Sequence, residues 1–193
     1  MAELIDARKL ACPQPVLLTI NALDKSDEVV TIVDNETARE NVSRMGKNRG
    51  FEVTAEQKGD GIYLTLRKTG TQAATKEQLP VASGTVLFIG SDVIGRGDNQ
   101  LGSLLMQTFF RTLDGLTSKP EAIVFMNHGV KLVANDSLVL EDLRRLEGEG
   151  TEILACGTCL SRLELTDKVG VGQVSNMYTI SDTMLKAGKV ISL

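Results

Sequence analysis

The feature that most constrains the fold is a change in the pattern of apolar residues across a stretch of small and polar residues. This stretch, TGTQAATKEQLPVASG, contains Pro80 and shows no sustained periodicity, which is typical of a linker. Before it, apolar and polar residues alternate in the predicted strands, whereas the predicted strands after it are apolar throughout. We therefore predict one domain over residues 1–69, a flexible linker over 70–84 and a second domain over 85–193.

The first domain is predicted to be a two-layer βαβαββ sandwich. Alternation predicts strands over residues 28–34, 51–57 and 61–67, and a short first strand lies near residues 4–6. Two amphipathic helices between these strands need a sheet face to cover, so two helices on four strands is the economical packing. Apolar side chains at helical spacing mark the two helices: Val16, Leu17, Ile20 and Leu23, then Ala38, Val42 and Met45.

The second domain is predicted to be a layered α/β domain with a mostly parallel sheet. TVLFI, AIVFM and EILAC are apolar throughout, as expected for strands covered on both faces. Helical patterns follow at residues 99–113, at 137–148 and in a short stretch after EILAC, and a last helix near 181–186 precedes KVISL. Both domains therefore belong to the α/β class.

Cys12 stands at the predicted start of the first helix, within ACPQPVLL. Pro13 is a favoured first helical residue, so Cys12 takes the N-cap position. The partial positive charge of a helix start stabilises a thiolate and lowers its pKa. Pro15 has no amide, which leaves the amides of Gln14 and Val16 as the nearest donors. Local chemistry alone fits a buried packing cysteine equally well.

LIDARKLACPQPVL and VDNETARENV, with the βαβαββ order, resemble the TusA/SirA family of small sulfur carriers over residues 3–68. The hallmark of that family is a CPxP motif whose cysteine carries sulfur as a persulfide, and Cys12, Pro13 and Pro15 match it in register. The resemblance thus favours a functional Cys12 over a packing residue. Lys9 departs from the family, where many members have glycine, and makes the rim of the site more basic.

Cys156 and Cys159 form a CxxC pair at the carboxyl end of EILAC, where open α/β sheets place their ligand crevices. Such a pair can form a disulfide, and the helix start after it is expected to lower the pKa of at least Cys156. A closed zinc site needs four ligands, and only His128 and Cys12 remain to complete it. We predict redox or sulfur exchange with no metal and no cofactor; a packing role for Cys156 stays open.

His128 and Lys131, in NHGVKL, follow the second predicted strand of the second domain. In a parallel sheet they are expected at the same end as CGTC, where they are candidates to orient or protonate a departing sulfur species. A histidine exposed to solvent without a chemical role is the alternative.

GRGDNQLG fits neither a dinucleotide fingerprint nor a Walker loop. We interpret Gly95 and Gly97 as turn formers and Asp98 as the cap of the next helix, although the free amides of such a loop can bind an anion.

GRGDNQLGSLLM, FMNHGVKLV and CGTCL resemble the DsrE-like fold. That fold includes sulfur-relay subunits with a reactive cysteine after the corresponding strand. The combination of a TusA-like and a DsrE-like domain resembles the YedF group, which is linked with selenium metabolism. Because DsrE-like relatives assemble, the resemblance also implies a homo-oligomer formed through the C-terminal domain.

Composition disfavours several classes of partner. A net charge of −4 and an aromatic content of 4% argue against direct binding of nucleic acid. No apolar run approaches the roughly 20 residues of a membrane span, and MAELIDARKL lacks the apolar segment of a signal peptide. We therefore predict a cytoplasmic protein with no membrane association, in which three cysteines are not structural disulfides.

These patterns predict a sulfurtransferase-like carrier of sulfane sulfur or selenium, held as a cysteine persulfide or selenosulfide. Cys12 accepts the atom from a persulfide donor such as a cysteine desulfurase. The Cys156/Cys159 pair then takes part in its transfer by thiol exchange, and the sequence does not identify the acceptor protein. Two alternatives stay open: a non-catalytic redox-sensing or regulatory binding module, and a CxxC thiol oxidoreductase that does not use Cys12.

Overall fold

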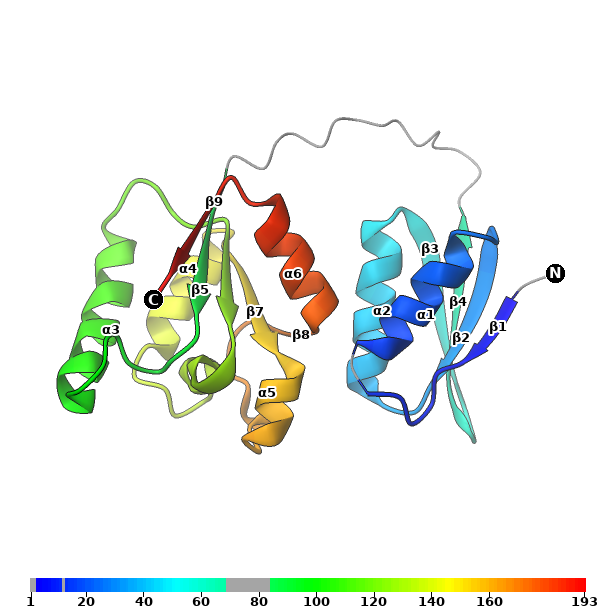
Figure 1. Ribbon diagram of the computed structural model, residues 1–193, viewed down its shortest axis with the longest axis horizontal. Coiled ribbons are helices and arrows are strands. Elements are labelled where there is room, and N and C mark those ends of the chain that lie inside the picture. The colour runs from blue at the N-terminus through cyan, green and yellow to red at the C-terminus, as the bar shows by residue number, and fades with distance from the viewer. Residues whose placement is uncertain (1–2, 12, 69–83) are drawn as a thin grey trace. The chain divides into compact units, whose positions relative to one another are not determined.

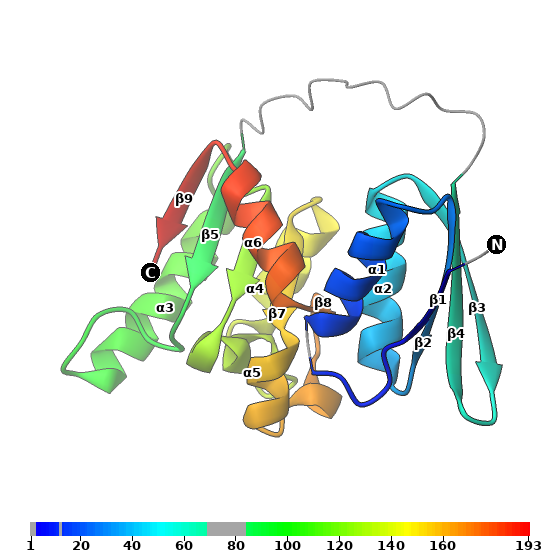
Figure 2. The same cartoon turned by 45° about the vertical axis from the view of Figure 1, so that its right-hand side comes forward.

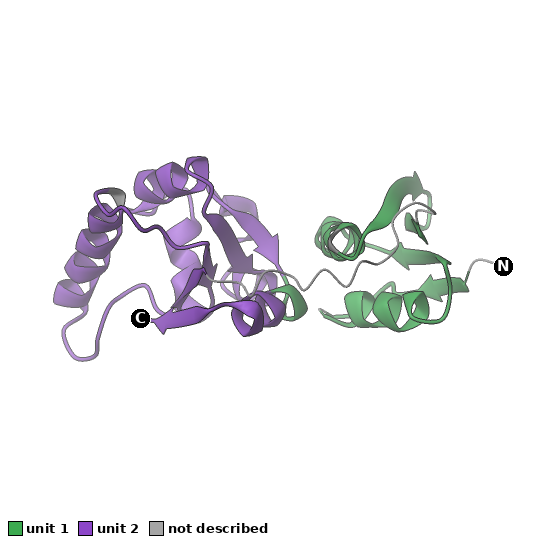
Figure 3. Cartoon of the chain, turned by 90° about the horizontal axis from the view of Figure 1, so that it is seen from above, with its two compact units in different colours: residues 1–77, 176–179 green, residues 78–175, 180–193 purple. Residues whose placement is uncertain are grey.

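The computed structural model describes residues 3–11, 13–68 and 84–193 (Figure 1). Cys12 and all of the predicted linker except Gly84 lie outside these residues. The chain divides into two compact units, residues 1–77 with 176–179 and residues 78–175 with 180–193 (Figure 3). The bounds of the two predicted domains stay a prediction.

The described part of the N-terminal region confirms the predicted βαβαββ order. Its elements are β1 (Glu3–Asp6), α1 (Gln14–Leu23), β2 (Glu28–Val33), α2 (Glu36–Asn48), β3 (Phe51–Lys58) and β4 (Gly61–Lys68). The strand order is β1-β2-β4-β3, with β1 parallel to β2 and β4 antiparallel to both of its neighbours. Both helices lie on one face of this mixed sheet (Figure 1).

The core of this region lies between the helices and the sheet. Val16 of α1 and Val42 of α2 are buried together with Leu64 and Leu66 of β4. Full burial of one such side chain stabilises a fold by about 1.5–3 kcal/mol. The helical spacing of apolar residues therefore fixes both helices to this face.

The C-terminal region has a separate sheet in which every neighbouring pair of strands is parallel, as predicted. Its strand order is β8-β7-β6-β5-β9. Helices α3 and α4 cover one face and α6 covers the other (Figure 2). The elements are β5 (Thr85–Ile89), α3 (Asn99–Asp114), β6 (Ala122–Phe125), η1 (Asn127–Val133), α4 (Leu140–Gly148), β7 (Glu152–Cys156), α5 (Gly157–Arg162), η2 (Thr166–Lys168), β8 (Gln173–Ser175), α6 (Met177–Lys186) and β9 (Lys189–Ser192).

The loop between β5 and α3 confirms the predicted turn and cap. Gly95 and Gly97 have φ angles of 85° and 113°, which suit glycine. The Asp98 side chain accepts hydrogen bonds from the amides of Gln100 and Leu101 at 2.9 and 3.1 Å, so it caps α3.

The elements η1, η2 and β8 were not predicted from the sequence. The 3₁₀ helix η1 follows β6 directly, and its Gly129 lies so close to β5 that a Cβ there would stand 2.2 Å from the Ile89 carbonyl oxygen. Glycine is therefore required for this approach. The strand β8 has three residues, which is too short to show a pattern in the sequence.

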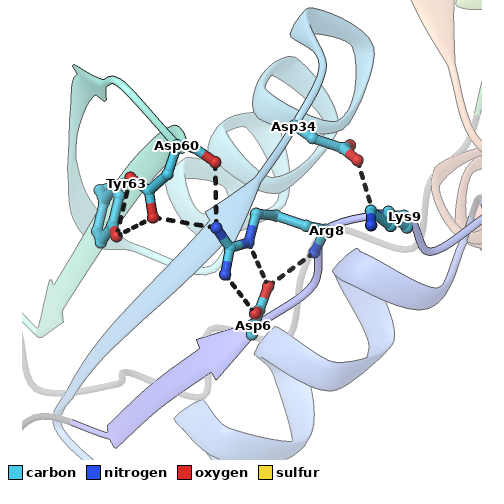
Figure 4. A network of polar contacts seen from close by, with 6 residues as sticks. All are labelled: Asp6, Arg8, Lys9, Asp34, Asp60 and Tyr63. Carbon is cyan, nitrogen blue, oxygen red and sulfur yellow. Dashed lines mark hydrogen bonds and ion pairs between the residues drawn. The ribbon is translucent and has the colours of Figure 1, made fainter.

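The loop between β1 and α1 is tied to the sheet by polar contacts (Figure 4). The Arg8 guanidinium pairs with Asp6 at 2.7 Å and with Asp60 at 3.0 Å. The hydrogen bond from Arg8 lowers the pKa of Asp6 to about 2. The Lys9 amide donates to Asp34 Oδ2 at 2.7 Å, and this bond lowers the pKa of the Asp34 carboxyl group. The loop that leads to Cys12 is thus held at the end of β2.

Lys9 adopts a left-handed backbone with a φ of 60°. Only glycine takes this conformation without a steric cost of about 1 kcal/mol or more. This geometry gives a physical reason for the glycine that the TusA/SirA resemblance implies at this position.

The Lys9→Gly variant is expected to stabilise the N-terminal region by about 0.5–1 kcal/mol, because it removes the strain of the left-handed backbone. Urea unfolding followed through the amide NMR signals of β2 and β4 measures the change. The matched control is Lys47→Gly in the last turn of α2, where loss of helix propensity should destabilise the region by up to about 1 kcal/mol. Equal destabilisation by both variants would contradict the strain argument.

The Asp34→Asn variant is expected to destabilise the N-terminal region by about 1 kcal/mol at pH 7, since it removes a charged acceptor that solvent partly screens. Because the folded pKa of Asp34 is lowered from 3.8, its contribution is present above pH 4 and is lost as the pH falls through the folded value. The same NMR-detected unfolding should therefore show the two proteins converging in acid. Asp27→Asn removes only a surface ion pair with Lys68 at 3.4 Å and should show no such convergence.

Candidate functional site

The helix α1 begins one residue later than predicted, so Cys12 precedes the N-cap rather than occupying it. Pro13 is the N-cap, because its carbonyl accepts the Leu17 amide at 3.1 Å. The Gln14 amide donates to the Ala11 carbonyl at 2.8 Å, so it is engaged in the turn and is not a free donor for a sulfur at Cys12. Cys12 itself lies outside the described residues, and its thiolate role stays a prediction.

A pocket of about 60 Å³ lies between this turn and α2. Leu10 and Pro13, the described neighbours on either side of the Ala11–Cys12 dipeptide, both line it. Its other lining residues come from the two helices and from the cap of α2: Pro15, Val16, Asn35, Thr37, Ala38 and Asn41. The Asn35 side chain accepts the Ala38 amide at 2.9 Å and so fixes the start of α2 beside the pocket. The second proline of the predicted motif is buried, and this makes the pocket wall rigid.

Cys156 ends β7 and is the N-cap of α5, as the sequence predicts for a strand-to-helix junction. Its side chain is buried, with 2% exposed. Burial raises the pKa of the Cys156 thiol, whereas the backbone amides of Cys159 and Thr158 act in the opposite direction and do not outweigh it. The expectation that the helix start lowers this pKa is therefore wrong, because α5 is a short helix and the apolar core surrounds the sulfur.

Cys159 lies in the first turn of α5 and is only half-buried. Its Sγ accepts a hydrogen bond from the Asn127 amide at 3.1 Å. Asn127 is the first residue of η1 and has a φ of 48°, a left-handed conformation that asparagine tolerates better than most residues. Parallel pairing of β6 with β7 places η1 and α5 at the same end of the sheet. Of the two sulfurs in this pair, Cys159 is the one that solvent reaches.

His128 and Lys131 both lie on η1, at the same end of the sheet as CGTC. Both are exposed. Lys131 Nζ pairs with Asp92 at 3.0 Å, on the wall of a second pocket of about 340 Å³ in the C-terminal region. Within residues 3–11, 13–68 and 84–193, no hydrogen bond joins His128 or Lys131 to either sulfur. A chemical role for these two residues stays a prediction.

Among the residues that the structure describes, no three His, Cys, Asp or Glu side chains come together in a way that could hold a metal ion. In the same part of the chain, no helix combines the length and the apolar character needed to cross a bilayer.

Sequence reasoning missed two asparagines that the structure places at these sites. Asn41 is 3% exposed and lines the pocket beside the CPxP turn, and Asn127 donates its amide to Cys159. A signal for Asn41 exists, since it lies three residues after Ala38 and four before Met45, on the buried side of α2. For Asn127 the signal is its position directly after a buried strand and before His-Gly, where a turn residue is expected.

Comparison with solved structures gives likenesses that each cover part of the chain. A SirA-like protein from Desulfitobacterium hafniense is 29% identical over 33% of this chain and 92% of its own, with a TM-score of 0.31. A protein of unknown function from Methanobacterium thermoautotrophicum is 24% identical over 57% of this chain and 99% of its own, with a TM-score of 0.43. The ychN protein from E. coli is 13% identical over the same shares, with a TM-score of 0.40.

Comparison with curated proteins gives no match. Among protein families, the one described as Sulfurtransferase TusA matches residues 3–68, the region that contains β1 to β4 and both helices of the first sheet. This match covers the CPxP turn and its pocket. The N-terminal region of the chain is therefore a TusA/SirA-like sulfurtransferase domain.

Proposed function

We propose that the chain is a sulfur carrier that holds sulfane sulfur or selenium on Cys12, as a persulfide or selenosulfide. The observation that carries the proposal is the TusA match over residues 3–68, a range that includes Cys12, Pro13 and Pro15 of the sequence. The tied loop before the motif and the capped start of α2 beside it support a preformed site.

The first step is thiol exchange and needs no external oxidant. The Cys12 thiolate attacks the terminal sulfur of a donor persulfide, such as that of a cysteine desulfurase. One S–S bond forms at Cys12 as the donor's S–S bond breaks, and the donor cysteine leaves as a thiolate. The sulfane sulfur keeps its oxidation state, so electrons balance.

We assign the second step to Cys159, because it is the less buried cysteine of the pair and its sulfur accepts a hydrogen bond from the Asn127 amide. The Cys159 thiolate attacks the terminal sulfur of the Cys12 persulfide. A new S–S bond forms at Cys159 as the S–S bond at Cys12 breaks, and Cys12 is released as a thiolate. Attack by Cys156 on the sulfur of Cys159 then releases hydrogen sulfide as the two cysteines are oxidised to a disulfide. The raised pKa of Cys156 makes this release slow at neutral pH, so Cys159 retains the atom for an acceptor protein.

The proposals for the C-terminal domain, its protein group and the link to selenium rest on the sheet of the C-terminal region. A parallel sheet with a CxxC pair at its carboxyl end supports a DsrE-like domain over residues 85–193 and, with it, the YedF group, its selenium link and assembly through this domain. The two cysteines that the structure describes, Cys156 and Cys159, are free thiols, which suits a reducing cytoplasm.

A thiol oxidoreductase is the second candidate, and one observation favours it: the Cys159 side chain is near enough to Cys156 to raise the pKa of its thiol, and Cys159 is only half-buried. In such an enzyme, the reduction potential of the Cys156/Cys159 pair would not change when Cys12 is substituted. A redox-sensing binding module would instead keep its partner affinity in the Cys12→Ser variant.

Incubation with a cysteine desulfurase and cysteine is expected to add the mass of one sulfur to Cys12, measured by mass spectrometry of the peptide that contains it. Cys12→Ser should abolish sulfur delivery to Cys159, because the entry thiol is lost. The matched control, Cys156→Ser with Cys159→Ser, should still load Cys12 to the wild-type level. An unmodified Cys12 in that control would refute the carrier proposal.

Alkylation of the unloaded protein is expected to distinguish the two cysteines of the pair. At pH 8, Cys159 should react about tenfold faster than Cys156 or more, because burial keeps the Cys156 thiol protonated and inaccessible. Peptide mass spectrometry after timed exposure to iodoacetamide gives both rates. Raising the pH to 10 should narrow the difference, and a faster Cys156 at pH 8 would reverse the assigned roles.

A further inference from the structure

The pocket of about 340 Å³ lies wholly within the C-terminal region, and the proposed sulfur chemistry does not use it. Its volume is near the lower end of the range of about 300–1,000 Å³ that is typical of small-molecule sites. Four elements form its walls: the loop after β5, helix α3, η1, and the segment between η1 and α4.

Polar contacts and one close approach hold these walls in place. Lys131 Nζ of η1 pairs with Asp92 of the loop at 3.0 Å. The Ile94 amide of the same loop donates to the Gly102 carbonyl of α3 at 3.1 Å. A Cβ atom at Gly102 would stand 2.8 Å from the Ile94 carbonyl oxygen, so this approach requires glycine. The pocket is therefore preformed, as small-molecule sites usually are.

The buried side chains of the lining are apolar. They are Met106 of α3, Leu132 of η1, and Val139, the N-cap of α4. Ser103 and Gln107 lie on the same face of α3 as Met106, because three and four residues separate neighbours on a helix face, and they add polar groups. A ligand that is partly hydrocarbon suits this combination, since its apolar part leaves water on binding.

The charges of the lining favour a cation. One cation and two carboxylates line the pocket, and Lys131 is already paired with Asp92. The other carboxylate, that of Asp136, is exposed, and among the residues that the structure describes its side chain has no hydrogen bond or ion pair. His128, the other titratable residue of η1, does not line the pocket. Along the same elements and the start of α4 the remaining charges balance in the sequence: Arg96 and Asp98, Arg111 and Asp114, Glu141 and Arg144, and Asp142 and Arg145.

We propose that this pocket binds a small primary amine, with its ammonium group at Asp136 and its hydrocarbon part against Met106, Leu132 and Val139. An ammonium group is a donor only, and an ionised carboxylate is an acceptor only, so the two are complementary. An α-amino acid carries the same ammonium group together with a carboxylate, for which Lys131 has two N–H groups beyond the one that faces Asp92. The inference goes beyond the proposed carrier function and does not depend on it.

NMR titration of the full chain at neutral pH with isoamylamine tests the proposal. Isovalerate and isoamyl alcohol are probes of nearly the same shape, the first an anion and the second uncharged. The amine should give saturable shifts of the amide signals of α3 and η1 with a dissociation constant of about 1–10 mM, because one exposed ion pair and a small apolar contact give low affinity. The other two probes should bind more weakly, by about fivefold or more.

Leucine distinguishes the two sources of the amine, because it is isoamylamine with one added carboxylate group. Tighter binding of leucine than of isoamylamine would assign the pocket to an amino acid, with Lys131 holding the carboxylate. Tighter binding of isoamylamine would assign it to a free amine.

Asp136→Asn should weaken the binding of isoamylamine about fivefold, which corresponds to about 1 kcal/mol, and should leave the weaker binding of isoamyl alcohol unchanged. Asp167→Asn is the matched control, because Asp167 is also exposed in the C-terminal region but does not line the pocket. It should change neither value.

Absence of saturable shifts with the amine, or equal binding of isoamylamine and isovalerate, would overturn the inference. An unchanged dissociation constant in Asp136→Asn, or the same loss in Asp167→Asn, would do so as well. Shifts of the same amide signals when only the protein concentration is raised would assign the pocket to contact between copies of the chain, and would also overturn it.

Discussion

The hydrogen bond from the Lys9 amide to Asp34 is the contact on which the N-terminal site depends. It ties the loop before α1 to the end of β2, next to the asparagine that caps α2. The starts of both helices are therefore fixed by neighbouring residues, Asp34 and Asn35. The pocket beside the CPxP turn exists because these two starts are held at a set distance.

In the C-terminal region, parallel pairing of the strands positions the candidate site residues. Because β6 and β7 end at the same edge, the residues that follow them meet there without a long loop. Close approach of η1 to β5 requires Gly129 and brings the Asn127 amide to Cys159. Because α5 begins directly after β7, Cys156 lies in the core, whereas Cys159 in the first turn of α5 is only half-buried.

Much of the fold could be predicted because apolar periodicity reports burial. The alternating and continuous strands, the two helices of the first sheet and the Asp98 cap all follow from local pattern. Helix α1 starts one residue late because the Pro13 carbonyl, not the preceding one, accepts the first bond. The sign of the Cys156 pKa shift could not be predicted, since desolvation depends on atoms distant in sequence. Asn41 was missed because only the packed structure shows that its Oδ1 is buried with no hydrogen-bond partner among the described residues.

The unequal exposure of Cys156 and Cys159 has a consequence for survival under peroxide stress. The half-buried sulfur of Cys159 is the one that an oxidant reaches first, giving a sulfenic acid. The shielded thiol of Cys156, three residues before it, can condense with that acid to a disulfide and expel water. Further oxidation to the irreversible sulfinic acid is thereby intercepted, and cellular reductants can restore both thiols.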